Sequence, residues 1–101
     1  MSVVQHILRE EYDRLQKLVN FYSEAIEKLP RGSISLKKRN NQVYAYLVYR
    51  DRKKVKFVYL GKENSKKVIE VSRHIETRKE NEKLLRQAKA NLKEIKKALH
   101  E

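Results

Sequence analysis

The spacing of apolar residues changes twice along this chain, and those changes limit the folds it can adopt. Apolar residues recur at helical spacing as far as Leu29, alternate with polar residues from Ser33, and return to helical spacing after Gly61. Pro30 and Gly32 separate the first two segments, because proline disfavours helical geometry at the residue before it. The pattern predicts an α+β fold: a hairpin of two long antiparallel helices with a three-stranded antiparallel β-meander inserted at its tip.

The length of 101 residues suits a single domain covering residues 1–101. Its expected segments are a helix over residues 2–28, the meander over 33–60 and a long helix over 64–100. Ser2 and Gln5 have the spacing of a capping box at the start of the first helix. Asn64 or Ser65 is expected to cap the second.

Two short turns set the register of the meander. They are expected at Asn40-Asn41 and at Asp51-Arg52. Pairing through the first turn sets Ile34 opposite Leu47 on a face of aliphatic side chains. Pairing through the second gathers aromatic side chains on the other face, with Tyr44 opposite Tyr59 and Tyr46 opposite Phe57.

The positive charge is concentrated in the meander. The net charge is +12, and residues 31–67 hold twelve basic residues against only Asp51 and Glu63. Residues 1–30 hold four basic and five acidic residues, and residues 68–101 hold nine and six. A clustered charge of this kind is typical of a surface that binds a polyanion.

Several classes of function are disfavoured by the composition. The chain has no cysteine, and His6, His74 and His100 are scattered without metal-site or catalytic spacing. Two glycines cannot form a phosphate-cradling loop, and the carboxylates do not converge. We therefore expect no enzymatic activity, no metal and no cofactor. No stretch approaches the ~20 apolar residues of a membrane span, so a cytoplasmic protein without a membrane partner is expected.

The predicted contact set for nucleic acid lies on the strands and turns of the meander. Lys and Arg would contact phosphates, and the aromatic side chains would stack on unpaired bases. A small sheet also fits the major groove of duplex DNA, and DNA is favoured over RNA. The predicted contact residues are Lys37, Lys38, Arg39, Tyr44, Tyr46, Arg50, Arg52, Lys53, Lys54 and Lys56. The aromatic residues can equally be explained as strand formers that pack in a core.

Three sequence motifs of the meander resemble known proteins. They are Leu29-Pro30-Arg31-Gly32-Ser33-Ile34, Tyr44-x-Tyr46-Leu47-x-Tyr49-Arg50 and Tyr59-Leu60-Gly61. Together they resemble a group of small uncharacterised bacterial and phage proteins. More loosely, the Gly-Ser-Ile opening and the basic meander before a helix resemble the arm-type DNA-binding domain of tyrosine recombinases. That resemblance implies a sheet in the major groove and contacts from Arg39, Arg50, Arg52, Lys54 and Lys56. It suggests an accessory protein of a mobile element.

The alternative function is a phage-type interaction module that inhibits a nucleic-acid-handling machine. Antiparallel pairing of the helices with Leu29 level with Val68 would leave the end of the second helix uncovered. A homodimer or another protein partner would then bury the remaining apolar side chains, Leu92, Ile95 and Leu99.

Overall fold

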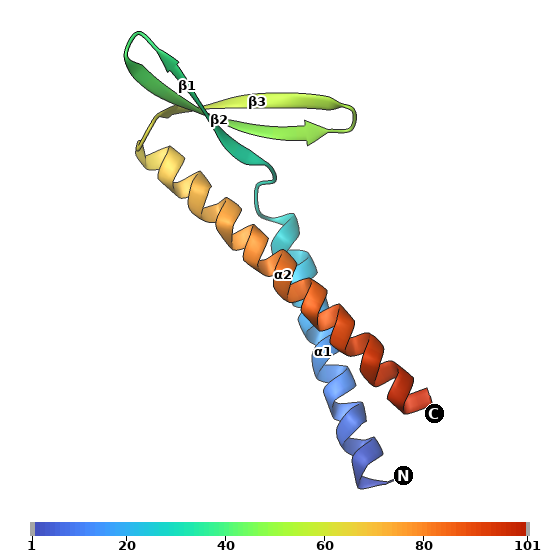
Figure 1. Ribbon diagram of the computed structural model, residues 1–101. Coiled ribbons are helices and arrows are strands. Elements are labelled where there is room, and N and C mark those ends of the chain that lie inside the picture. Colours follow the sequence, from blue (N-terminus) through green and yellow to red (C-terminus); the bar gives the residue numbers. More distant parts are fainter. Residues whose placement is uncertain (1, 101) are drawn as a thin grey trace. The chain divides into compact units, whose positions relative to one another are not determined.

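The computed structural model describes residues 2–100 and consists of two helices with a three-stranded antiparallel sheet between them (Figure 1). The α+β fold predicted from the sequence is confirmed. The elements are α1 (Val3–Glu27), β1 (Ser33–Arg39), β2 (Gln42–Asp51), β3 (Lys54–Lys62) and α2 (Lys66–His100). Their ends fall within two residues of the predicted ones.

The chain divides into two compact units, and α2 contributes to both. A sheet unit comprises residues 29–78, which include the three strands and the first turns of α2. A helical unit comprises residues 1–28 together with residues 79–101, which include α1 and the rest of α2.

In the sheet unit, the first hairpin has the predicted register. The strand order is β1-β2-β3, and Ile34 pairs with Leu47. The turn residues Asn40 and Asn41 both have positive φ, at 49° and 64°. A type I′ turn needs positive φ at both central positions, and asparagine adopts it at lower cost than most residues.

The predicted register of the second hairpin is wrong by two residues. Asp51 pairs with Lys54, so the turn residues are Arg52 and Lys53, and only Arg52 has positive φ, at 60°. Tyr46 therefore lies opposite Tyr59, although Phe57 was its predicted partner. A shift of two residues preserves the alternation of faces, so the separation into an aliphatic and an aromatic face survives the error.

A β-bulge in β3 changes the register again near the end of the sheet. Tyr46 pairs with Tyr59, but the next pair is Ala45 with Gly61, which leaves Leu60 without a partner in the ladder. Such an extra residue bends a strand and increases its twist. Leu60 is only 7% exposed, so the bulge places an apolar side chain in the core.

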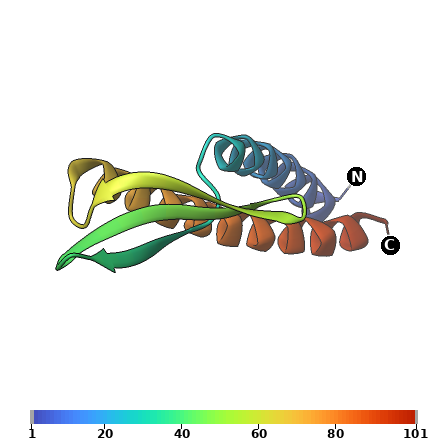
Figure 2. The same cartoon turned by 90° about the horizontal axis from the view of Figure 1, so that it is seen from above.

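The aliphatic face packs against the first turns of α2. Ala45, Leu60 and Val68 form the buried cluster of the sheet unit, with Ile34, Leu47 and Val71 packed around it. Figure 2 looks down on the meander, and the first turns of α2 lie beneath it. The other face of the sheet carries the aromatic side chains.

Ser65 immediately precedes α2 and caps the helix through its backbone but not through its side chain. Its carbonyl oxygen accepts the first helical hydrogen bond, from the amide of Ile69 at 3.0 Å. Its hydroxyl is buried and makes no hydrogen bond to the described residues. Asn64 has positive φ, at 65°, which turns the chain from β3 into the helix.

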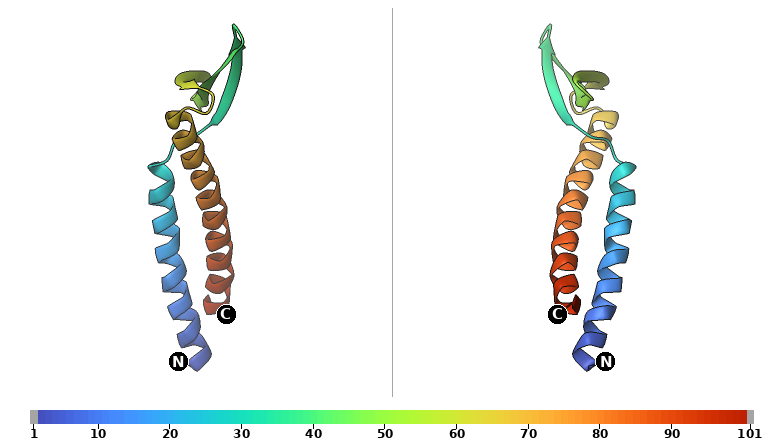
Figure 3. Two further views of the ribbon diagram at one scale, coloured as in Figure 1. Left: turned by 90° about the vertical axis from the view of Figure 1, so that its left-hand side faces the viewer. Right: turned by 90° about the vertical axis from the view of Figure 1, so that its right-hand side faces the viewer.

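In the helical unit, α1 and the second half of α2 run antiparallel (Figure 3). The predicted capping box is present: the Ser2 hydroxyl accepts from the amide of Gln5 at 3.1 Å, and the Gln5 side chain accepts from the amide of Ser2. Leu15 and Ala88 are buried, at 3% and 6% exposure. Within residues 2–100, neither helix combines the length and apolar character needed to cross a bilayer.

The predicted alignment of the two helices is wrong. We expected Leu29 beside Val68, but Val68 packs in the sheet core. The guanidinium of Arg78 instead donates to the carbonyl oxygen of Leu29 at 2.8 Å. Leu29 is therefore hydrogen-bonded to a residue ten positions beyond Val68, which corresponds to about 15 Å along the helix.

This alignment removes the reason for expecting an uncovered tail on α2. Leu92, Ile95 and Leu99 are each partly buried. It is the start of α1 that projects further (Figure 3), and there Val3, Val4 and Ile7 are 76%, 65% and 57% exposed.

Gly32 fixes the entry of the chain into β1. Its φ of +104° is one that residues with a side chain rarely adopt. A Cβ at this position would lie 2.1 Å from the carbonyl oxygen of Val48, so the backbones of the two segments would have to separate. Gly61 has a φ of +138°. A Cβ added there would approach the Ser65 hydroxyl oxygen most closely, at 3.0 Å.

We expect Gly32→Ala to reduce the free energy of unfolding by about 3 kcal/mol or more, because it adds a backbone clash to an unfavourable φ. Gly61→Ala should cost roughly 1–2 kcal/mol, from the φ alone. Urea unfolding followed by circular dichroism would measure both, with Arg31→Ala as an exposed control expected within about 0.5 kcal/mol of the parent. Equal losses for the two glycine variants would contradict the role assigned to the Val48 carbonyl.

Candidate nucleic-acid interface

The structure divides the ten predicted contact residues between the two faces of the sheet and one turn. Side chains alternate along a strand, so the register assigns each to a face. Lys37, Arg39, Tyr44, Tyr46 and Arg50 belong to the face that does not pack on α2. Lys38, Lys54 and Lys56 belong to the aliphatic face, and Arg52 and Lys53 form the β2–β3 turn. The predicted set is therefore not one continuous surface.

We call the face opposite α2 the open face. Its side chains come from all three strands: Ser33, Ser35, Lys37, Arg39, Gln42, Tyr44, Tyr46, Val48, Arg50, Val55, Phe57, Tyr59 and Lys62. Phe57 and Tyr59 are each 53% exposed, and Val55 is 50% exposed. Phe57 and Tyr59 therefore contribute little to the core of the sheet unit, whereas Tyr44 and Tyr46 are partly buried.

The aromatic rings of the open face touch one another edge to face. The centroids of Tyr46 and Tyr59 lie 5.5 Å apart with the ring planes at 61°. Those of Tyr44 and Tyr59 lie 6.2 Å apart at 47°. Such tilted arrangements follow the ring quadrupoles and do not cover both faces of each ring. The Tyr44 hydroxyl donates to the side-chain oxygen of Gln42 at 3.0 Å, which holds that ring at the end of the sheet.

Lys37 extends across the rings from the neighbouring strand. Its ammonium nitrogen lies 4.7 Å from the centroid of Phe57 and 5.2 Å from that of Tyr46. A cation over a ring at an exposed site contributes about 0.5–1 kcal/mol. The contact is therefore weak enough for a ligand to displace, and it leaves a positive charge in the middle of the open face.

A shallow hollow of about 260 Å³ lies at the end of the open face near the first turn. It is lined by Arg39, Asn40, Tyr44, Tyr46 and Tyr59. Three rings and one guanidinium thus surround the same space. A planar group with an adjacent negative charge would match this lining.

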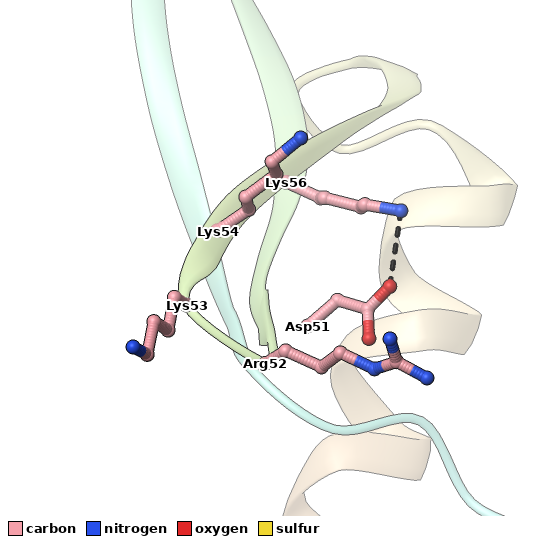
Figure 4. A pocket seen from close by; sticks show the side chains of 5 residues that line it. All are labelled: Asp51, Arg52, Lys53, Lys54 and Lys56. Carbon is pink, nitrogen blue, oxygen red and sulfur yellow. Dashed lines mark ion pairs between the residues drawn. The ribbon is translucent and has the colours of Figure 1, made fainter.

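The tip of the β2–β3 hairpin carries a second group of charges (Figure 4). Lys56 and Asp51 form an ion pair at 3.0 Å, with side chains 48% and 46% exposed. Arg52 extends to the same side as the Asp51 carboxylate, whereas Lys53 points away from it (Figure 4). An exposed pair of this kind stabilises a fold by at most about 1 kcal/mol, so its main effect is to neutralise one lysine of the tip.

Both faces of the sheet carry positive charge, but they differ in their carboxylates. Among the described strand residues, Asp51 is the one carboxylate, and it lies on the aliphatic face beside Lys56. The open face carries Lys37, Arg39, Arg50 and Lys62 without an acidic partner on the strands. It can therefore offer cations and ring faces to the same ligand.

The predicted contact set omits Phe57 and Tyr59, which complete the open face. The signal that identifies them is the alternation in β3, where Val55, Phe57 and Tyr59 share one side of the strand. Their exposure could not be read from that alternation, because it depends on which face α2 covers.

The histidines and carboxylates of the described part of the chain are dispersed. Residues 2–100 bring together no group of three such side chains that could hold a metal ion. His6 lies 3.1 Å from Glu10 one helical turn away, but both side chains are more than two-thirds exposed.

Comparison with known proteins identifies a family without a described activity. No curated protein and no solved structure shows significant similarity to the chain. A family model described as a domain of unknown function (DUF6788) matches residues 6–70, which span most of α1, the whole meander and the start of α2. The match covers well over half of the sequence, so the chain belongs to the DUF6788 family.

Proposed function

We propose that this chain is a non-enzymatic nucleic-acid-binding protein that docks the open face of its sheet on DNA or RNA. The observation that supports this most directly is the composition of that face. Exposed aromatic rings lie among Lys37, Arg39 and Arg50, with no carboxylate on the same side of the strands.

The charge distribution of the whole chain supports the same proposal. Residues 31–67 carry twelve of the 25 basic residues and two of the 13 acidic ones. Lys and Arg that neutralise phosphates release counterions, which provides most of the affinity for nucleic acid at low salt. An accessory role in a mobile element is part of the proposal and rests on the resemblance of the meander to recombinase arm domains.

The open face is favoured over the aliphatic face because α2 occupies the latter. Ala45 and Leu60 are buried under Val68, so a ligand could reach only the margins of that face. Lys38, Lys54 and Lys56 lie on strands there and would contribute to a long-range positive field. They would not form the surface of contact.

A triple substitution of Lys37, Arg39 and Arg50 to Gln should weaken binding and flatten its salt dependence. Each phosphate contact contributes about 0.9 to the slope of log K against log salt for duplex DNA and about 0.7 for a single strand. We therefore expect the slope to fall by roughly two to three units. Fluorescence anisotropy of a labelled oligonucleotide across a range of salt concentrations would measure it.

The matched control replaces Lys38, Lys54 and Lys56 by Gln, which removes the same charge from the opposite face. This control should change the slope by less than about one unit, because lost long-range attraction is screened over a Debye length of about 10 Å at 0.1 M salt. Equal changes in both variants would show that binding follows net charge alone. No binding of the parent to any nucleic acid would favour the protein-interaction module instead.

Asp51→Asn should strengthen binding. The substitution releases Lys56 from its ion pair and removes the one negative charge of the hairpin tip. Because Lys56 lies outside the proposed surface of contact, the gain should come from the long-range positive field alone, and the salt slope should steepen by less than about one unit. A slope steeper by about 0.9 or more would contradict this and show that the hairpin tip contacts a phosphate directly.

A further inference from the structure

We infer that the open face binds an unpaired strand, whose bases stack on the rings of Tyr46, Phe57 and Tyr59. The inference rests on the proposed function and specifies its ligand as single-stranded nucleic acid. Three observations on this face carry it: the exposure of the rings, their mutual geometry and the placement of the cations.

The rings have faces that a ligand can reach. Phe57 and Tyr59 are each 53% exposed on an edge strand, and the 61° angle between Tyr46 and Tyr59 prevents the two rings from covering each other. Base stacking on aromatic side chains tolerates any sequence, because every base has a flat π-face.

Lys37 indicates where a base would lie. Its ammonium stands 4.7 Å from the Phe57 centroid and 5.2 Å from the Tyr46 centroid, so these ring faces attract a cation from the neighbouring strand. The flexible stem of a lysine allows the ammonium to move aside to a phosphate when a base takes its place. Ring and charge would then contact one nucleotide.

The two arginines lie at opposite ends of the open face. Arg39 pairs with Gln42 at the start of β2, and Arg50 lies at the end of β2. Eight residues of strand separate position 42 from position 50, which corresponds to roughly 26 Å. A backbone that runs from one arginine to the other passes Lys37 and the rings, which matches a strand of a few nucleotides.

A duplex fits the same face poorly. The faces of its bases are covered by their neighbours, so only groove edges and phosphates remain for contact. Sequence-reading contacts in the major groove come mainly from Arg, Lys, Asn and Gln. The middle of the open face instead presents rings, with Val48 and Val55 beside Phe57, and of these four residue types it carries only Lys37.

The test compares Tyr59→Leu with Tyr59→Phe. Leucine keeps an apolar side chain without a π-face, whereas phenylalanine keeps the ring. Probes are labelled oligo(dT) and oligo(rU) of about 15 nucleotides, a duplex of the same length and heparin as a charge-only polyanion. We expect the parent to prefer the single strands. Tyr59→Leu should weaken them by about 5- to 150-fold, while Tyr59→Phe stays near the parent and heparin and duplex change little.

Circular dichroism would confirm that Tyr59→Leu is folded. If it is not, Phe57→Trp provides a second test, because the chain has no tryptophan of its own. Stacking predicts that oligo(dT) or oligo(rU) quenches this tryptophan and that the duplex does not.

Two results would overturn the inference while leaving nucleic-acid binding intact. One is tighter binding of the duplex than of either single strand. The other is an equal loss of heparin and single-strand affinity in Tyr59→Leu, which would show that the ring acts only through the fold. Failure of the parent to bind any nucleic acid would instead overturn the proposed function itself.

Discussion

The packing of Val68 against Ala45 and Leu60 determines which face of the sheet is available to a ligand. A three-stranded sheet has two faces, and in the sheet unit the first turns of α2 cover one of them. Ala45, in the central strand, is fully buried in this contact. Because side chains alternate, burying Ala45 turns its neighbours Tyr44 and Tyr46 to the other side. The aromatic character of the open face is thus a consequence of the aliphatic core beneath it.

The bulge at Leu60 both places Leu60 in that core and sets the direction in which the chain leaves β3. With Leu60 out of the ladder, β3 still pairs through Lys62, and the amide of Glu63 donates to the Val43 carbonyl at 2.9 Å. Gly61 and Asn64, both with positive φ, then turn the chain into α2. An uninterrupted ladder would place Gly61 on the opposite side of the sheet, because one residue reverses the faces. The bulge therefore sets the start of the helix that covers the aliphatic face.

Alternation of apolar residues predicted the strands and both faces, and the asparagine pair located the first turn, because these signals are local. The second turn was misplaced because Asp51-Arg52 and Arg52-Lys53 have similar composition, and neither contains glycine. The bulge at Leu60 was not predicted because Gly61 was expected to end the strand, whereas a glycine inside a strand often marks a bulge. The predicted helix alignment was wrong because of tertiary packing. The first turns of α2 pack against the sheet, and Leu29 is hydrogen-bonded to Arg78. Both errors left the division into an aliphatic and an aromatic face intact, but the ten predicted contact residues divide between these two faces and the β2–β3 turn.

The open face also has a thermodynamic consequence for the sheet unit. Phe57 and Tyr59 leave about half of their surface in water, and four cations share one side of a small sheet without an acidic neighbour on the strands. Burying a large apolar side chain stabilises a fold by about 1.5–3 kcal/mol, so this arrangement forgoes stability that a core-directed sequence would gain. A polyanion that covers the rings and neutralises the cations would restore part of it, since a ligand that binds only the folded state stabilises that state. The same residues that make the free sheet less stable are therefore those whose coverage by a strand would stabilise it.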